Sequence, residues 1–524
     1  MAKKYDSGSS LQEKVLSGVD TLADNVASTL GPRGRNVILH RKDSNPIITK
    51  DGVTISKFVD LEDPFENAGA QIIKQVAART ADECGDGTTT STVLARAILQ
   101  ESQKYIVAGS SPVEIKKGMD RTVQAIVEQL RGLARPISSV EDIEHVATIS
   151  ANGDEVIGKL IAAAVDASGK DGSITVEEAR SVDTSLDLVE GFRFDSGYVS
   201  PQFITNEHRG SVRYEDPLIL VTDHEVTTVE EILPILEVVA RENRPLVIVC
   251  ENIEGQALAA LIMNSIRGTM KVAAVKAPRY GEERRNILKD LAMSIGSTFV
   301  SRESRMDLKS VKLVDMGTAK TIDIIKNLTT IVGGKGDPSE VEKKIESLKT
   351  ELEQTDSLYE CERIQERITR LASGVAVVRV GGSTEVEMIE KKHRVEDALE
   401  AVRSAQQEGI LPGGGVAYVR SLKNLKVAYD NDDQKIGGKI ICEIVKEPIR
   451  QMANNAGASA DLILSKVAKL NKNKGWDFAS GRVVDMFEHG IVDPAKVTRV
   501  ALQNAVSAAS TLITTNYAIV ESDH

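Results

Sequence analysis

A glycine-rich turn with the sequence GDGTTT, at residues 85–90, has the residue types that bind a phosphate group. Backbone N–H groups at a helix N-terminus converge on an anion, and glycines let the chain approach it closely. The hydroxyls of Thr88, Thr89 and Thr90 add donors, and the carboxylate of Asp86 suits a hard cation such as Mg²⁺. The turn therefore indicates a phosphate site. The competing interpretation is a tight Asp-Gly turn in which threonine caps the helix.

Three other loops offer backbone donors or a carboxylate beside an amphipathic helix. Each of them, taken alone, is also compatible with an ordinary turn. The loops are Gly31-Pro32, Lys50-Asp51-Gly52 and Gly413-Gly414-Gly415.

Asp397 is a further candidate, on a segment predicted to be helical. Val395, Ala398, Leu399 and Val402 form the apolar stripe of residues 394–408, so Asp397 projects away from the packed face. A solvated acid is the alternative interpretation of this residue.

Composition excludes several classes of function. A net charge of -12 and only 3% aromatic residues argue against nucleic acid as a partner. The four cysteines and seven histidines form no paired metal-ligand motif, so no transition metal is expected. The N-terminus lacks the apolar stretch of a signal peptide, and no run of about 18 apolar residues occurs. We therefore expect a cytoplasmic protein that does not enter a membrane.

The elements that position these residues follow from hydrophobic periodicity. At 524 residues the chain is too long for one core, so several domains are expected. Both ends of the chain are mainly helical, and the GDGTTT turn opens the second of two long helices. Short strands are expected at 36–40 and 46–50, and helices at 64–83, 88–107, 384–408, within 436–469 and at 494–512.

The middle of the chain alternates apolar strands with helices, which predicts an α/β domain with parallel strand pairs inserted between the helical ends. A charged segment, 339–371, predicts an antiparallel helix pair that packs on its own domain, with a break near Asp356. An intermolecular coiled coil is the alternative interpretation. The strands are expected at 218–222, 245–250, 272–277 and 297–301, and the helices at 229–242, 256–267 and 283–295.

Two of these central helices carry more apolar residues than one buried stripe needs. Part of residues 229–240 and 257–266 could face outwards as an interaction surface, and burial between layers is the alternative.

Taken in order, six motifs resemble those of the group I chaperonins of the GroEL type, and the resemblance covers essentially the whole chain. The motifs are TLGPRGRNV (29–37), ITKDGVTI (48–55), GDGTTT (85–90), RVEDAL (394–399), GGG (413–415) and DPAKVTR (493–499).

The resemblance implies a multidomain, GroEL-like fold with a mainly α-helical equatorial ATPase domain, a small α+β intermediate hinge domain and an α/β apical domain. The implied boundaries are 1–133 and 409–524 for the equatorial domain, 134–190 and 374–408 for the intermediate domain, and 191–373 for the apical domain.

For the equatorial domain the resemblance implies an ATP site with Mg²⁺ on Asp86, and K⁺ as a further ion. Asp397 and Asp51 would be catalytic, with Asp397 swinging in from the intermediate domain to position the attacking water. The nucleotide would be lined by Thr29, Leu30, Gly31, Pro32, Lys50, Asp51, Asp86, Gly87, Thr88, Thr89, Thr90, Gly413, Gly414, Asp477, Ala479 and Asp493.

For the apical domain the resemblance implies apolar grooves that bind unfolded polypeptides and a GroES-type co-chaperonin. The subunit would hydrolyse ATP in a homo-oligomeric ring, heptameric and single or double, that encloses its substrate. The matching apical residues are Tyr198, Phe203, Leu233, Leu236, Leu258, Ile262 and Met263.

Some segments depart from the family's pattern. Gln202 stands at a position that is usually aromatic, and Trp476-Asp477-Phe478 changes the expected shape of the adenine pocket. The segment AGASA, 456–460, lacks the acidic residues that the family presents to an opposite ring, which leaves the double ring open. Two other functions also stay open, a small-molecule ATPase or kinase and a chaperonin paralogue that binds without folding.

Overall fold

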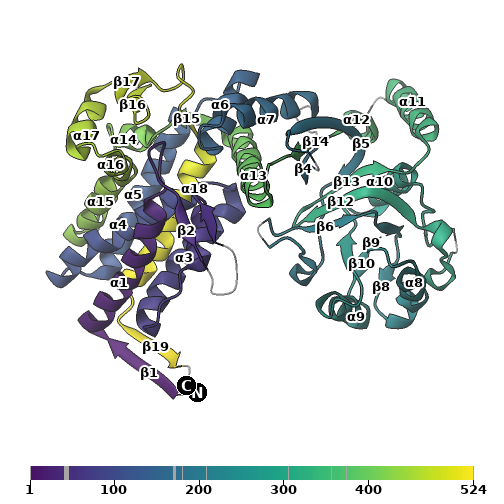
Figure 1. The fold of residues 1–524 in the computed structure, drawn as a ribbon, viewed down its shortest axis with the longest axis horizontal. Coiled ribbons are helices and arrows are strands. Elements are labelled where there is room, and N and C mark those ends of the chain that lie inside the picture. The colour runs from purple at the N-terminus through teal and green to yellow at the C-terminus, as the bar shows by residue number, and fades with distance from the viewer. Residues whose placement is uncertain are drawn as a thin grey trace. The chain divides into compact units, whose positions relative to one another are not determined.

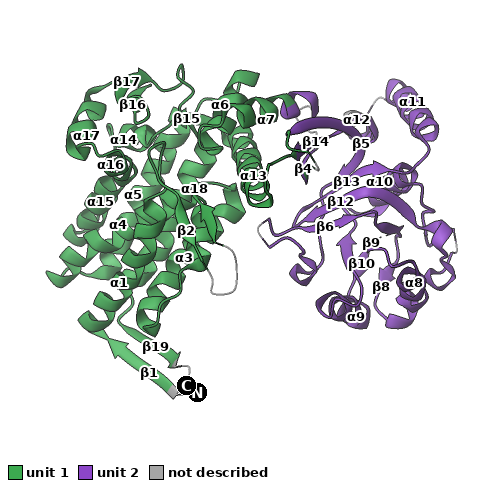
Figure 2. Cartoon of the chain, viewed as in Figure 1, with its two compact units in different colours: residues 1–163, 178–183, 380–524 green, residues 164–177, 184–379 purple. Residues whose placement is uncertain are grey.

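The chain folds into two compact units that differ in architecture (Figure 2). The computed structural model describes residues 2–40, 46–168, 173–179, 181–207, 209–304, 306–355, 357–372, 374–471 and 473–522. Unit 1 holds residues 1–163, 178–183 and 380–524, and unit 2 holds residues 164–177 and 184–379. Unit 2 is thus inserted between the chain ends that build unit 1. The three-domain division remains a prediction, because the segments expected to form the intermediate domain are shared between the two units.

Unit 1 is mainly helical, as expected for the two ends of the chain (Figure 1). Helix α4 lies inside it, with Leu94, Ala95 and Ile98 buried against its neighbours α1, α3 and α18. The helices are α1 (Gly8–Ala27), α2 (Gly52–Phe58), α3 (Pro64–Cys84), α4 (Thr88–Val107), α5 (Pro112–Leu133), α6 (Val140–Ser150), α7 (Glu155–Ser168), α13 (Glu385–Glu408), α14 (Val416–Ser421), α15 (Asp432–Ile444), α16 (Glu447–Asn455), α17 (Ala460–Lys469) and α18 (Ala495–Ile513), of which α7 continues into unit 2.

Four antiparallel strand pairs complete the described part of unit 1 and confirm the strands expected near residues 36–50. The pair β15–β18 bears most directly on the site, because it sets Leu411 opposite Asp493 and so brings the glycines after β15 close to that carboxyl group. The pairs are β1 (Ala2–Ser7) with β19 (Tyr517–Ser522), β2 (Val37–Leu39) with β3 (Ile47–Thr49), β15 (Ile410–Pro412) with β18 (Val492–Pro494), and β16 (Lys474–Asp477) with β17 (Arg482–Asp485).

Unit 2 is built on a mixed sheet with the strand order β11-β9-β7-β12-β13-β5-β14-β4, to which β6 adds on β12. Strands β7, β9 and β11 pair in parallel and are almost entirely apolar and buried, which confirms the predicted α/β pattern. The strands are β4 (Ser173–Glu178), β5 (Ser185–Phe194), β6 (Val212–Glu215), β7 (Leu218–Val221), β9 (Leu246–Cys250), β11 (Val272–Lys276), β12 (Gly317–Ile325), β13 (Leu328–Gly334) and β14 (Gly374–Val380), with the short parallel pair β8 (Glu225–Val226) and β10 (Asn252–Ile253) beside them.

The helices of unit 2 agree with the predicted ranges, and the charged helix pair packs on its own unit. Leu348 of α11 and Ile364 and Ile368 of α12 join the core of unit 2, which supports surface helices over an intermolecular coiled coil. Asp356, in the predicted break, lies outside the described residues. The helices are α8 (Val229–Glu242), α9 (Gly255–Ile266), α10 (Gly281–Ile295), α11 (Pro338–Gln354) and α12 (Leu358–Ala372).

One expected strand, residues 297–301, does not form. Val300 makes a single parallel bridge to Thr222, just beyond the end of β7. The chain then turns, because the Ser301 and Ser304 side chains each accept a hydrogen bond from the other residue's backbone N–H. These local hydrogen bonds between serine side chains and the backbone form in place of the β-sheet hydrogen bonds that a strand would need.

Across the described ranges, no helix combines the length and the apolar character needed to cross a membrane.

Candidate functional site

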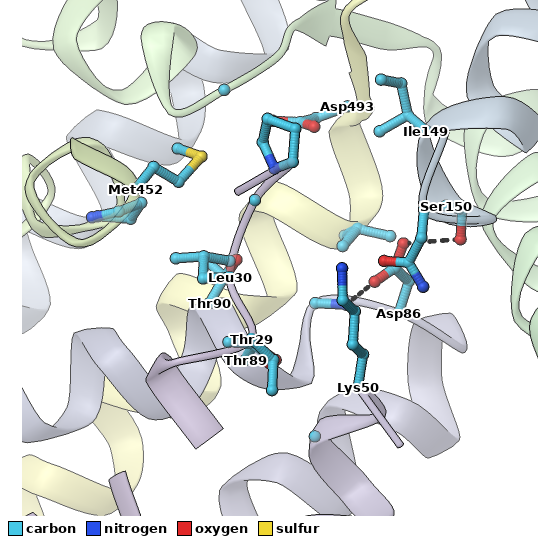
Figure 3. Close-up of a pocket in the computed structure, with 18 of the residues that line it drawn as sticks. Thr29, Leu30, Lys50, Asp86, Thr89, Thr90, Ile149, Ser150, Met452 and Asp493 are labelled. Carbon is cyan, nitrogen blue, oxygen red and sulfur yellow. Dashed lines mark hydrogen bonds between the residues drawn. The ribbon is translucent and has the colours of Figure 1, made fainter. Parts of the chain in front are cut away.

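A cavity of about 430 Å³ in unit 1 gathers segments from both ends of the chain (Figure 3). It is lined by every residue predicted for the nucleotide except Gly413. Gly413 lies behind the cavity wall, where its N–H donates to the Ile491 carbonyl at 2.9 Å, and the next glycines, Gly414 and Gly415, form the wall instead. The lining residues from the predicted set are Thr29, Leu30, Gly31, Pro32, Lys50, Asp51, Asp86, Gly87, Thr88, Thr89, Thr90, Asp397, Gly414, Asp477, Ala479 and Asp493.

The N-terminus of α4 presents free backbone donors to this cavity. The first N–H group bonded within the helix belongs to Ser91, which donates to the Gly87 carbonyl at 2.9 Å, so the three preceding threonine N–H groups have no intrahelical acceptor. Gly87 has φ +83°, and a Cβ there would stand 2.6 Å from the Val497 side chain. The turn therefore requires glycine, and its geometry is that of an anion site at a helix N-terminus.

Asp51 is the N-cap of α2, whose start touches the start of α4. Its carboxylate accepts hydrogen bonds from the backbone N–H groups of Val53, at 3.1 Å, and Thr54, at 2.7 Å. A Cβ on Gly52 would stand 2.7 Å from the Thr88 hydroxyl, so α2 approaches α4 more closely than any larger residue allows. Asp51 is thus held rigidly at the cavity wall, and its catalytic role remains a prediction.

Asp86 is oriented by two hydrogen bonds. Its Oδ1 accepts from the Gly87 N–H at 2.5 Å, and its Oδ2 accepts from the Ser150 hydroxyl, at the end of α6, at 3.0 Å (Figure 3). Burial raises the pKa of Asp86, these two hydrogen bonds lower it, and the nearby charge of Asp51 raises it again. The net effect is a pKa above the ordinary aspartate value.

Asp397 faces the same cavity from α13. Its pKa is raised well above the ordinary value, first by burial and then by the negative charges of Asp51 and Asp86. Asp493 and these three residues are four of the carboxyl groups that line the cavity, and their negative charges repel one another until a cation enters.

The carboxyl groups fit a magnesium ion that arrives with phosphate oxygens. Among the described residues, no cluster of three or more His, Cys, Asp or Glu side chains could hold a metal unaided. Mg²⁺ is commonly held by one or two carboxylates together with substrate phosphates and water, and Asp86 beside the α4 N-terminus supplies that arrangement. Lys50 and Arg394 also line the cavity and add positive charge for an anionic ligand.

Two loops form the side of the cavity predicted for adenine. The Asp477 carboxylate accepts from the backbone N–H groups of Ala479, at 2.8 Å, and Ser480, at 3.2 Å. Arg33 donates to the Ala479 carbonyl at 2.8 Å, which ties this loop to the segment that carries Leu30. Asp477 therefore shapes its own turn. Trp476, Phe478 and Met452 give this side of the cavity an apolar lining, consistent with the altered shape expected from the sequence.

Several lining residues were not among the predicted ones. Arg394 lies inside the RVEDAL motif and Ser150 lies in the segment TISAN (148–152), but nothing in their spacing distinguishes them from helical surface residues. Gly415 was noted only as the third glycine of its run. Met452 carries no local signal, because only packing brings α16 to the cavity.

Asp493 provides a pH-dependent test of the cavity's electrostatics. Burial and the charge of Asp86 raise its pKa to about 6, while hydrogen bonds from the N–H groups of Gly415 and Gly414 oppose the rise. The folded state binds the proton of the Asp493 carboxyl group more tightly than the unfolded state does. The ionised carboxylate therefore lowers the free energy of unfolding above pH 6, and this loss of stability disappears as pH falls toward 4.

We therefore expect Asp493→Asn to stabilise the nucleotide-free, Mg²⁺-free protein by about 2 kcal/mol at pH 7.5 and to lose this advantage at pH 4.5. Thermal unfolding at both pH values measures the difference. The exposed Asp82→Asn on α3 is the control. An equal stability gain at both pH values would mean that packing, and not ionisation, is responsible.

The predicted apical residues in unit 2 divide into exposed and buried ones. Leu233 of α8 is 47% exposed and Met263 of α9 is 46% exposed, while Tyr198, Leu258 and Ile262 are partly covered. Part of each helix thus faces outwards. This agrees with the interpretation that some of the apolar residues are exposed, and not with burial of all of them between layers.

Phe203 and Leu236 require a correction. Phe203 is fully buried and Leu236 is 7% exposed, and both pack in the core of unit 2. A polypeptide on the surface cannot reach them in this structure. Ile266, at the end of α9, is 62% exposed. It lies in the segment that could face outwards but was not among the residues matched to the apical surface.

Comparison with known proteins adds two findings. A family model described as the TCP-1/cpn60 chaperonin family matches residues 22–523. Among solved structures, the chaperonin gp146 from the bacteriophage EL 2 (Pseudomonas aeruginosa), determined in the presence of ATP-BeFx, superposes with a TM-score of 0.65. The match covers 99% of each chain at 21% sequence identity, so it shows a shared fold. The predicted chaperonin fold is confirmed.

Proposed function

The chain belongs to the TCP-1/cpn60 chaperonin family, and on that premise we propose that it is the subunit of an ATP-driven ring that captures non-native polypeptides and encloses them during folding. The observation that carries this proposal is the cavity of unit 1. It joins a phosphate cradle at the start of α4 to carboxyl groups from three other parts of the chain. A cavity of this kind serves ATP hydrolysis better than simple binding.

In the proposed reaction, each part of the cavity has a separate task. The N–H groups and hydroxyls of Thr88, Thr89 and Thr90 hold the phosphates, and Asp86 would hold Mg²⁺. Bound there, Mg²⁺ would supply positive charge beside the phosphate oxygens. Asp397 accepts a hydrogen bond from the attacking water and orients it, and Lys50 contributes positive charge.

The exposed apolar residues of α8 and α9 support capture of polypeptide. Leu233, Met263 and Ile266 lie on two neighbouring helices, and methionine adapts to partners of different shape. We propose that the same residues contact a GroES-type co-chaperonin. The ring is proposed to be heptameric and to work in the cytoplasm, with K⁺ as an additional ion at the ATP site.

The number of stacked rings is left open by the described surface. Residues 456–460 carry no acidic side chain, and the nearby Arg450 is already paired within the subunit with Asp461 at 2.5 Å and Glu443 at 2.8 Å.

Electron microscopy of the purified protein with and without ATP tests the whole proposal. Rings with ATP-dependent apical movement are expected, the layers can be counted directly, and a monomeric particle under both conditions would overturn it.

The apical assignment predicts a separable defect. Leu233→Glu is expected to reduce capture of a chemically unfolded protein at least tenfold while leaving basal ATPase within about twofold, because it places a charge on the exposed apolar face without touching unit 1. Capture is measured as suppression of aggregation by the ring.

A matched control adds the same charge elsewhere in unit 2, at the exposed Tyr359 on α12, as Tyr359→Glu. This control should capture normally. Equal loss in both variants, or none in Leu233→Glu, would remove α8 from the binding surface.

A further inference from the structure

Helix α13 is attached to the turn that carries Asp86 by a hydrogen bond outside the cavity. The Ser404 hydroxyl donates to the Cys84 carbonyl at 3.1 Å, and Ser404 is only 3% exposed. Cys84 is the last residue of α3, so no backbone N–H of that helix donates to its carbonyl. The Ser404 hydroxyl supplies the missing donor. The bond joins two elements that are far apart in the sequence.

The backbone around this bond is closely packed. Gly85 has φ +70°, and a Cβ there would stand 2.1 Å from the Glu400 Cβ of α13. The helix therefore rests directly on the turn, with Glu400 and Ser404, one helical turn apart, on the contact side. Any side chain at position 85 would push α13 away.

Ser404 and Asp397 lie on the same face of α13. They are seven residues apart, which is two turns of an α-helix, so both side chains project in nearly the same direction. Asp397 lines the cavity, and Ser404 contacts the chain two residues before Asp86. One helix face thus spans the distance from the proposed water-orienting carboxylate to the turn that would hold Mg²⁺.

The far end of α13 is fixed to a different helix. Arg499 of α18 makes a bidentate ion pair with Glu408, at 3.0 and 2.5 Å, and Lys496 donates to Gln407 at 2.9 Å. These contacts hold the C-terminal end of α13. Ser404 lies between that end and Asp397, and its hydroxyl forms the hydrogen bond to the turn that carries Asp86.

We propose that Ser404 is a positioning residue for ATP hydrolysis, which sets the position of Asp397 by docking α13 on the Cys84 carbonyl. The inference rests on the proposed function. Ser404 touches neither nucleotide nor water, so its effect on turnover passes through Asp397. Loss of the hydroxyl lets α13 move by a fraction of an ångström, which matters for a group that orients water.

Ser404→Ala is expected to lower kcat for ATP about five- to tenfold and to leave ATP affinity, measured by direct binding, unchanged. The Ser510→Ala variant is the matched control, because Ser510 is equally buried on α18 but bonds within its own helix. It should retain full turnover.

A second measurement does not depend on activity. The Cys84 thiol is only 2% exposed, so it should react very slowly with an alkylating reagent. Loosening of α13 in Ser404→Ala should raise the alkylation of the peptide containing Cys84, read by mass spectrometry. The Ser510→Ala protein should match the wild type.

A double-mutant cycle separates positioning from general destabilisation. In an Asp397→Ala background, Ser404→Ala should have no further effect on turnover, because its target is gone. The same five- to tenfold loss in that background would overturn the proposal, as would unchanged kcat in the single variant. If the wild-type protein hydrolyses no ATP, the proposed function itself fails, and the alkylation result still reports whether Ser404 docks α13.

Discussion

Replacing Asp397 with alanine is expected to slow ATP turnover by about 10²–10³-fold while ATP affinity stays within about threefold of the wild-type value. The carboxylate is assigned to the attacking water and not to the nucleotide, so its loss removes an interaction made mainly in the transition state. Its pKa is raised by burial and by repulsion from Asp51 and Asp86, so removing it also relieves repulsion, which opposes any loss of affinity.

Single-turnover hydrolysis and equilibrium binding of ATP, measured on the same preparation, test this expectation. Glu385→Ala is the control, because Glu385 is an exposed acid on the same helix. A parallel fall in binding and turnover would show that Asp397 holds the nucleotide itself, and unchanged turnover would remove it from the mechanism.

Asp86→Asn is expected to reduce turnover at least 100-fold at ordinary Mg²⁺ concentration and to raise the Mg²⁺ concentration needed for half-maximal activity. An amide keeps the hydrogen-bonding shape of the side chain but lacks the charge that attracts a hard cation. The amide oxygen can still accept from the Gly87 N–H, and the Ser150 hydroxyl can turn to accept from the amide NH₂, so the loop should remain folded.

The Mg²⁺ dependence of ATPase activity, titrated over a wide range, is the decisive measurement. Asp82→Asn, on the exposed side of α3 and four residues earlier, changes the net charge equally and should behave as wild type. An unaltered Mg²⁺ requirement in Asp86→Asn would assign the ion to another carboxyl group, of which Asp51 is the nearest candidate by its electrostatic influence on Asp86.

The apical helices show where periodicity stops being informative. In α8 the residues Ile232, Ile235, Leu236 and Val239 are buried, while Leu233 is exposed. All five are apolar and lie within two turns, so hydropathy alone cannot say which of them the sheet covers. The resemblance placed Leu236 on the surface with Leu233, and only the packed structure separates them.

The GDGTTT turn could be interpreted from the sequence because its chemistry is local. Glycines at positive φ, a helix that starts at Thr88 and free N–H groups in its first turn all depend on neighbouring residues. The same holds for the long helices and the apolar parallel strands. Local propensity and hydrophobic patterning are sufficient for such features.

The sequence by itself thus determined the GDGTTT turn, the helical and α/β segments and, through ordered motifs, the chaperonin resemblance. The resemblance had already placed Asp86, Asp397 and Asp493 at one site, and the tertiary structure shows that they line one cavity. Only the tertiary structure decided that Ser150 orients Asp86 and that Ser404 joins α13 to Cys84. The physical reason is that hydrogen bonds within a turn or helix are set by residues a few positions apart. Contacts between distant segments depend on how whole helices pack.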